Sequence, residues 1–365
     1  MSCTPENLDK NEVSSLEEYE NDSTDTEEIP IVNYRFLTEK KIGGEETYIL
    51  HIAATPDADC NIVIGTSDDV CEIYRLGENQ LAKIETFESN DTITGVQTCP
   101  NNNNLFYCGS TKSIKLWDIR TPQKFTLEIS EGIEDAKPLA CFEVSPNNRL
   151  LTAGSELHQG EAFMLFWDIR NVRLMGAYWQ SHSDTITQVK FSNNDVNTIM
   201  SGSVDGLINV FDAKCTNEDD ALLDSFNTGS SVEQLLWYER QGKNWISCIT
   251  HTSDIQLWAT GIEPYVHFRR SDITKAMKRK SEAHCYIVSS HSNKLGDVLV
   301  LTGAHSKNKE YLSLMNISTK ELVYLGNLIE NKQRVRCSFY NPNHNLLLTG
   351  GELGLLNVWN INPKS

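Results

Sequence analysis

The residues that could carry out chemistry lie far apart in this chain of 365 residues. His284 and Cys285 are neighbours of metal-ligand type, but a zinc site needs three or four protein ligands and this pair has no partners. His182 and Asp205 could act as a catalytic pair, although no nucleophile accompanies them. No Walker A, GxGxxG, HExxH or GxSxG motif is present. We therefore predict no enzyme, no cofactor and no metal; catalysis would need residues from distant segments to converge.

The elements that would hold such residues form a repeat. Its pattern is an apolar stretch, a turn, a second apolar stretch, and an aromatic residue followed by a small polar one. The clearest copies are SIKLWDIR (113–120), FMLFWDIR (163–170), GLINVFDA (206–213), DIQLWATG (254–261) and LLNVWNIN (355–362). The aromatic position is filled in turn by Tyr74, Trp117, Trp167, Phe211, Trp258, Met315 and Trp359. A period of about 40–45 residues with a Trp-Asp ending is typical of four-stranded propeller blades.

With these motifs the chain resembles the WD-repeat family over roughly residues 31–365. The resemblance implies an all-β fold, a seven-bladed β-propeller without catalysis. Only six residues follow Trp359, too few for the outer strand of the last blade. We expect the strand-like segment 31–37 to supply that strand and close the ring, which removes two exposed sheet edges.

Residues 1–30 differ from the rest. They hold ten acidic residues and one lysine and few branched apolar residues, so we predict a disordered acidic tail followed by a single propeller domain over 31–365. The whole chain has 32 Lys and Arg against 50 Asp and Glu. This acidic balance disfavours a general binder of nucleic acid. In the basic segment 268–280, Asp272 could cap a short helix. The segment could serve as a nuclear import signal or as a contact for RNA or an acidic partner, and the alternative is a solvated loop on the rim.

Composition also indicates the cellular compartment of the protein. The ten cysteines form no CxxC motif and fall in apolar segments, where reduced, buried thiols are expected. No apolar run reaches the ~18–20 residues of a membrane helix, and the acidic N-terminus is unlike a signal peptide. The sequence predicts a soluble, monomeric intracellular protein of the cytoplasm, the nucleus or both, with no membrane partner.

The family resemblance implies a buried relay of hydrogen bonds in one repeat. Its His, Ser and Asp positions are filled by His182, Ser201 and Asp205, and Phe211 replaces the Trp. The relay would orient the blade rather than catalyse a reaction. Other repeats lack relay members, so their stability must come from apolar packing.

A second implication concerns the WDIR sequence, which occurs in two consecutive repeats. It resembles the box by which propellers dock onto the damaged-DNA-binding adaptor of cullin-4 ubiquitin ligases. The candidate docking residues are Trp117, Asp118, Arg120, Trp167, Asp168 and Arg170. Thr111 and Glu161 stand where the box has an upstream Asp, and the alternative is that both arginines are solvated or pair locally.

The opposite, narrow face would be built from loops that precede each first strand. Aligning the repeats places there Tyr48, Thr92, Pro138, Thr185, Ser231 and Arg334, with Lys332 nearby. A Tyr with cationic neighbours can anchor a protein partner. The favoured function is therefore a non-enzymatic interaction scaffold, the alternative a cullin-4 substrate receptor, and the distant alternative a binder of nucleic acid or histone tails.

Overall fold

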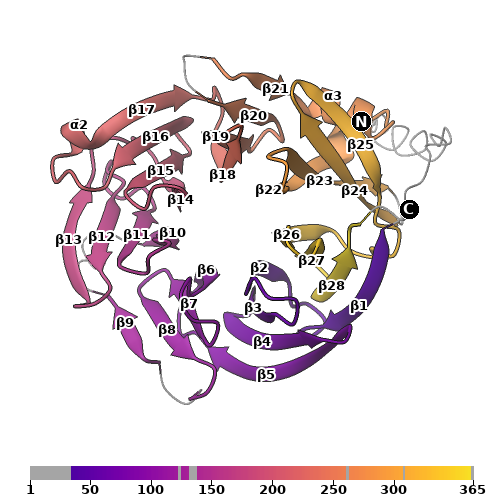
Figure 1. The fold of residues 1–365 in the computed structure, drawn as a ribbon, viewed down its shortest axis with the longest axis horizontal. Coiled ribbons are helices and arrows are strands. Elements are labelled where there is room, and N and C mark those ends of the chain that lie inside the picture. The colour runs from indigo at the N-terminus through magenta and orange to yellow at the C-terminus, as the bar shows by residue number, and fades with distance from the viewer. Residues whose placement is uncertain (1–33, 122–124, 131–137, 260–262, 307–308, 363–365) are drawn as a thin grey trace, which may run out of the picture.

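A computed structural model describes residues 34–121, 125–130, 138–259, 263–306 and 309–362. In it, seven four-stranded antiparallel sheets form a ring around a central opening (Figure 1). This confirms the predicted seven-bladed propeller. The tail predicted over residues 1–30 lies outside the described residues.

Six blades use four consecutive strands, which run from the centre of the ring outward (Figure 1). Blade 1 contains β2 (Ile49–Ala54), β3 (Asn61–Thr66), β4 (Val70–Gly77) and β5 (Gln80–Glu88). Blade 2 contains β6 (Ile93–Thr98), β7 (Leu105–Ser110), β8 (Ile114–Asp118) and β9 (Leu127–Ile129). Blade 3 contains β10 (Leu139–Val144), β11 (Leu150–Ser155), β12 (Met164–Asp168) and β13 (Arg173–Tyr178). Blade 4 contains β14 (Ile186–Phe191), β15 (Thr198–Ser203), β16 (Leu207–Asp212) and β17 (Leu222–Asn227).

The remaining blades lead back to the start of the ring. Blade 5 contains β18 (Val232–Arg240), β19 (Lys243–Thr250), β20 (Ile255–Trp258) and β21 (Val266–Phe268). Blade 6 contains β22 (Cys285–Ser292), β23 (Val298–Ser306), β24 (Lys309–Ser318) and β25 (Glu321–Asn327). Blade 7 contains β26 (Val335–Asn341), β27 (Leu346–Gly351), β28 (Leu355–Asn360) and, as its outer strand, β1 (Arg35–Lys41).

The ring closes as the sequence predicts, through an N-terminal strand. β1 pairs antiparallel with β28 and places Phe36 opposite Trp359, with the ring centroids 5.0 Å apart. The Lys41 ammonium donates a hydrogen bond to the Leu353 carbonyl at 2.6 Å. The strand begins four residues later than the segment 31–37 that we expected, and residues 31–33 lie outside the described residues.

The repeated aromatic position explains how neighbouring blades hold together. Trp167, Trp258, Trp359 and Phe211 are all fully buried, and each lies on the third strand of its blade. The second strands of the blades are almost wholly buried, as in β3, where all six residues are buried. Burial of large apolar side chains is the main stabilising term, so the aromatic residue of these four repeats anchors its blade.

Short helices interrupt this pattern at two connections: α2 (Glu218–Ala221) in blade 4, and α3 (Arg270–Ala276) with the 3-10 turn η1 (Glu282–His284) between blades 5 and 6. Ile273 and Met277 bury α3 in the shared core of those blades. The expectation for Asp272 needs correction: it is the third helical residue rather than the N-cap, and its carboxylate accepts the Arg269 backbone N–H at 3.0 Å. None of the helices in the described part of the chain has the length and apolarity to cross a membrane.

Candidate functional site

The predicted relay is present in blade 4. His182 Nδ1 lies 3.0 Å from Asp205 Oδ2, and His182 Nε2 lies 2.7 Å from Ser201 Oγ. Asp205 also accepts the backbone N–H groups of Ser183 and Leu207, each at 2.9 Å. Burial alone would raise the pKa of Asp205, but the hydrogen bond and charge of His182 and these backbone donors bring it below its ordinary value. The relay therefore ties the loop before β14 to strands β15 and β16.

A serine, a histidine and an aspartate in this order also describe a hydrolase triad. The Ser201 side chain is fully buried, however, and His182 is 6% exposed, so no substrate carbonyl can reach Ser201 Oγ. The arrangement can orient a blade, but it cannot perform acyl transfer in this conformation.

Blade 7 achieves the same result with a residue that the sequence did not point to. The buried Gln333 accepts the backbone N–H groups of Leu353 and Leu355 at 3.1 and 3.2 Å. Trp359 Nε1 donates to Thr349 Oγ1 at 3.1 Å. Gln333 thus takes over part of the role of Asp205, and because the family pattern has His and Asp at the relay, no motif revealed it.

The two WDIR sequences form the same local structure in blades 2 and 3. Arg120 donates to the two Asp118 carboxylate oxygens at 2.9 and 2.7 Å, and Arg170 does so to Asp168 at 3.0 and 2.7 Å. These hydrogen bonds hold the pKa of each aspartate below its usual range. The arginines keep 62% and 64% of their side-chain surface exposed.

The WDIR aspartates also cap the turn after the third strand. The backbone N–H of Arg120 donates to Asp118 at 2.9 Å, and that of Arg170 donates to Asp168 at 3.0 Å. The same turn occurs where no arginine is present, since the N–H of Lys214 donates to Asp212 at 3.0 Å. The remaining candidate docking residues, Trp117 and Trp167, pack inward, and Trp167 is fully buried.

The residues predicted for the narrow face occupy one equivalent position. Each directly precedes an innermost strand, and its carbonyl accepts the N–H of the residue that follows the second strand. The bonds, 2.8–3.0 Å long, are Ser67→Tyr48, Thr111→Thr92, Glu156→Pro138, Val204→Thr185, His251→Ser231 and Glu352→Arg334. The structure therefore brings all six loops to one face.

Blade 6 adds a residue that the sequence analysis missed. Its innermost strand β22 has the bulge shared by all innermost strands, but between Ile287 and Ser289, so Tyr286 is its equivalent residue. The Arg334 guanidinium lies over the Tyr286 ring, 4.8 Å from its centroid. No signal marked Tyr286, because this repeat has Met315 in place of the aromatic residue and longer strands.

Part of this face combines apolar and cationic groups, where blades 7 and 1 meet. We call it the blade 7–1 patch: Tyr48, Leu50, Leu353, Arg334 and Arg336. Its apolar side chains are exposed, at 42% for Tyr48, 38% for Leu50 and 48% for Leu353. Two guanidinium groups share one carboxylate, since Arg336 forms an ion pair with Glu352 and Arg334 Nε lies 4.0 Å from the same oxygen. The patch therefore carries one positive charge in excess of that carboxylate.

A glycine keeps the two blades of this patch close. Gly354 has φ +61°, and a Cβ there would lie 2.6 Å from the Thr47 carbonyl oxygen. The turn that carries Leu353 can therefore rest directly against the segment before Tyr48. The remaining predicted cation, Lys332, forms an ion pair with Glu39 at 3.0 Å.

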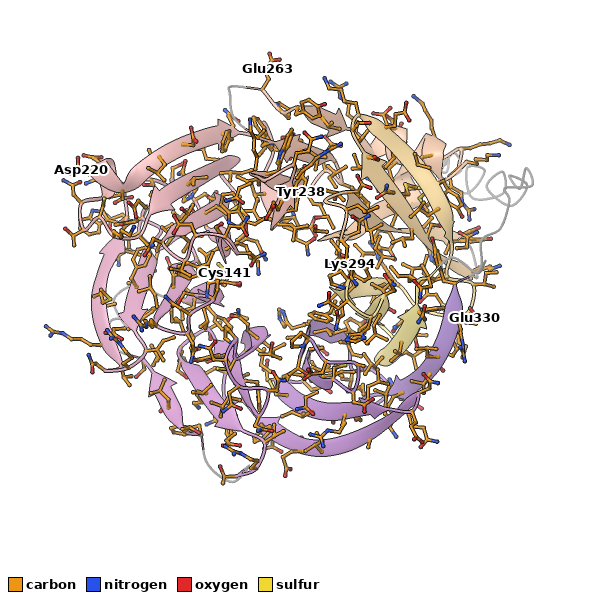
Figure 2. All side chains as sticks on the ribbon, viewed as in Figure 1. Cys141, Asp220, Tyr238, Glu263, Lys294 and Glu330 are labelled. Carbon is orange, nitrogen blue, oxygen red and sulfur yellow. The ribbon has the colours of Figure 1, made fainter. Side chains whose placement is uncertain are left out.

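The ring also encloses polar space. The innermost strands border a central channel of about 650 Å³, and an ion pair of 2.8 Å between Lys190 and Glu143, from neighbouring blades, lies in its lining. In Figure 2, Cys141 lies at the edge of this opening, whereas Asp220, Glu263 and Glu330 lie on the outer rim. No group of three or more His, Cys, Asp or Glu that could hold a metal occurs among the described residues.

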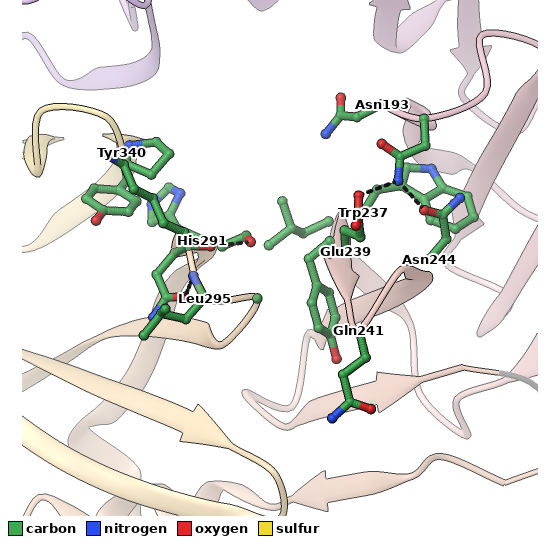
Figure 3. A pocket seen from close by; sticks show the side chains of 16 residues that line it. Asn193, Trp237, Glu239, Gln241, Asn244, His291, Leu295 and Tyr340 are labelled. Atoms are coloured by element: carbon green, nitrogen blue, oxygen red, sulfur yellow. Dashed lines mark hydrogen bonds between the residues drawn. The ribbon is translucent and has the colours of Figure 1, made fainter.

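A second pocket, of about 670 Å³, opens at the C-terminal ends of the innermost strands, whereas the narrow-face residues precede these strands (Figure 3). Trp237, Leu295 and Tyr340 contribute ring or aliphatic surface to it, and amide side chains dominate the rest. Asn194 donates to Glu239 at 2.9 Å and to Asn244 at 2.8 Å. The sequence gave no indication of this pocket, because its residues come from strands and turns of four different blades.

Comparison with known proteins agrees with this geometry. The family model described as WD domain, G-beta repeat matches residues 81–118 and 175–212. These two segments of the chain are similar to WD repeats. Each matched repeat begins on the outer strand of one blade and ends on the third strand of the next, at Asp118 and Asp212, directly after the aromatic residues Trp117 and Phe211.

The relatives found carry WD repeats as well. An uncharacterized WD repeat-containing protein of Schizosaccharomyces pombe is 24% identical over 87% of this chain and 96% of its own length. The WD repeat-containing protein 89 homolog of Dictyostelium discoideum is 23% identical over 88% of this chain and 85% of its own length. WD repeat-containing protein GTS1 of Arabidopsis thaliana is 32% identical over 42% of this chain and 38% of its own length. WD-repeat propellers are typical protein-interaction scaffolds.

Proposed function

We propose that this WD-repeat protein is a non-enzymatic scaffold that binds a protein partner on its narrow face, centred on the blade 7–1 patch. The observation that carries the proposal is the exposure of Tyr48, Leu50 and Leu353 beside two arginines that share one carboxylate. Exposed apolar surface next to polar groups is characteristic of interaction sites. Tyr and Arg are also the residues most often found at binding hot spots.

The chemistry of the patch defines the partner it fits. Tyr48 and Leu353 offer apolar surface to one or two apolar side chains, and Arg336 can donate hydrogen bonds to a partner's carboxylate once Glu352 is displaced or shared. Because the ring fixes the patch before binding, little conformational entropy is lost on association. The proposed partner therefore presents apolar residues beside acidic ones.

The test is quantitative affinity purification of the full-length protein beside a Tyr48→Ser, Leu353→Ser, Arg336→Glu variant. A matched control, Asn193→Ala with Gln241→Ala, alters the pocket on the other face. Circular dichroism checks that all three proteins are folded. We expect the amount of each partner recovered with the patch variant to be at least tenfold lower than the amount recovered with the control. Equal partner sets for all three proteins would contradict the proposal.

A second candidate function is that of a substrate receptor which docks the cullin-4 adaptor through the two WDIR sequences. The observation favouring it is that Arg120 and Arg170 are held identically and remain exposed at equivalent ends of neighbouring blades. The same purification tests it with an Arg120→Glu, Arg170→Glu variant. Adaptor bound to the wild type and lost from this variant supports a receptor whose substrate face is the blade 7–1 patch. If the adaptor is absent from the purifications of both the wild type and this variant, the WDIR sequences serve only to form the turn after the third strand.

A further inference from the structure

Two cysteine thiols meet where blade 1 packs against blade 2. Cys71 lies near the start of β4 and Cys108 near the end of β7, and their Sγ atoms are 2.9 Å apart. Both side chains are buried, with 1% and 8% of their surface exposed. Other thiols behave differently: Cys141 and Cys337 donate to backbone carbonyl oxygens.

The contact follows from the repeat positions of the two residues. Cys108 occupies the position that Ser201 holds in the relay of blade 4, opposite the start of the third strand. Cys71 lies three residues before Tyr74, where blade 4 has the buried Ile208. Cysteine at both positions places one thiol from each blade at the same point of their boundary.

We propose that Cys71 and Cys108 form a peroxide-sensitive disulfide that joins blade 1 covalently to blade 2. A disulfide has an S–S length of about 2.05 Å, so closing the observed gap requires a movement of less than about 1 Å. The bond would close a segment of 37 residues. This redox-sensitive cysteine pair goes beyond the proposed scaffold function.

The oxidant belongs to the class of hydroperoxides. One thiolate attacks a peroxide oxygen, the O–O bond breaks, and a sulfenic acid and hydroxide form. The second thiol then attacks the sulfenic sulfur, so that the S–S bond forms and water leaves. In total, two thiols and one hydrogen peroxide give one disulfide and two waters, with two electrons passing from sulfur to peroxide.

The surroundings select a small oxidant. A cavity of about 10 Å³ adjoins the pair and is bordered by Ser89, Ser110 and Lys115, which is space for about one water-sized molecule. Hydrogen peroxide is close to that size, whereas glutathione is far larger. Cys108 is the more exposed thiol and is therefore the first to react. The hydrogen bond with Cys108 and burial both raise the pKa of Cys71, so it acts as the resolving thiol.

The experiment uses the reduced full-length protein, treated with hydrogen peroxide and then blocked with N-ethylmaleimide. Trypsin leaves Cys60 with Cys71 in one peptide and Cys99 with Cys108 in another. The protein therefore carries Cys60→Ser and Cys99→Ser, which makes any cross-link between these peptides unambiguous by mass spectrometry. We expect a linked peptide pair lighter by two hydrogens, lost on reduction, and a rise of about 5 °C in the unfolding midpoint.

Two variants in the same background complete the test. Cys71→Ser and Cys108→Ser each should show neither the linked peptides nor the rise in midpoint. Should either variant fail to fold, the linked peptides of the parent protein still decide. The proposal is overturned if Cys71 and Cys108 both remain open to N-ethylmaleimide after unfolding of the peroxide-treated protein, while the partly exposed Cys215 has become oxidised.

Discussion

His182 connects the buried Ser201 hydroxyl to the Asp205 carboxylate. Replacing it with Ala leaves the buried Ser201 hydroxyl unsatisfied and removes the imidazole from Asp205 Oδ2, which keeps only the Ser183 backbone N–H, so we expect the free energy of unfolding to fall by roughly 1–3 kcal/mol. Urea unfolding followed by tryptophan fluorescence measures this change. His267, whose ring is a third exposed and lies 3.3 Å from Asp254, provides the control. His267→Ala should change the stability by less than about 0.5 kcal/mol, and equal losses in both variants would refute the structural role of the relay.

At the scale of the element, β1 determines whether the ring is closed. Phe36 packs edge to face against Trp359, so Phe36→Ala should destabilise the protein by roughly 2–3 kcal/mol and expose the β28 edge. Lys40 lies in the same strand with an exposed side chain, and Lys40→Ala serves as the control. Thermal unfolding compares the two, and hydrogen exchange of β28 shows whether its edge has opened. Identical midpoints together with unchanged protection of β28 would mean that β1 does not hold the ring shut.

The elements also show what could be predicted from the sequence. The repeated aromatic position and the short segment after Trp359 were enough to predict seven blades and their closure, because both depend on local patterns and on counting. The relay was predictable since blade 4 keeps three of its four members. Tyr286 and Gln333 were not, because a degenerate repeat hides an equivalent position and an unrelated side chain can satisfy the same backbone donors. The blade 7–1 patch depends on the exposure of residues from both ends of the chain, which no local pattern reports.

For the whole molecule, the histidines along the channel give stability a pH dependence. Burial lowers the pKa of His51 to about 4, against a smaller opposing contribution from the backbone of Ile93, and burial lowers the pKa of His291 to about 4. An unfolded histidine has a pKa near ~6.5. Between these values the unfolded chain binds more protons than the folded one. The contribution of these two histidines to the free energy of unfolding is therefore fully present above pH ~6.5 and declines as the pH falls towards about 4.

Replacing His291 with Gln should flatten this decline, because one of the two groups no longer titrates. Denaturation midpoints measured from pH 7.5 to about 4.5 test the change. His344→Gln, on an exposed turn, should leave the slope as it is in the wild type. A wild-type midpoint that stays constant over this range would show that both imidazoles remain hydrated in the folded ring.

The bond between Lys41 and Leu353 spans 312 residues of sequence, and this has a consequence in time. A ribosome adds ~5–20 residues per second, so β1 emerges about 15–60 seconds before its partner strand has been made. Throughout that interval the nascent chain presents an unpaired strand at one end of the incomplete ring of blades. Chaperones that shield such edges would be needed during synthesis. A synonymous codon change that slows translation of blades 2 to 6 would lengthen the time for which the edge must be shielded, without altering a single side chain.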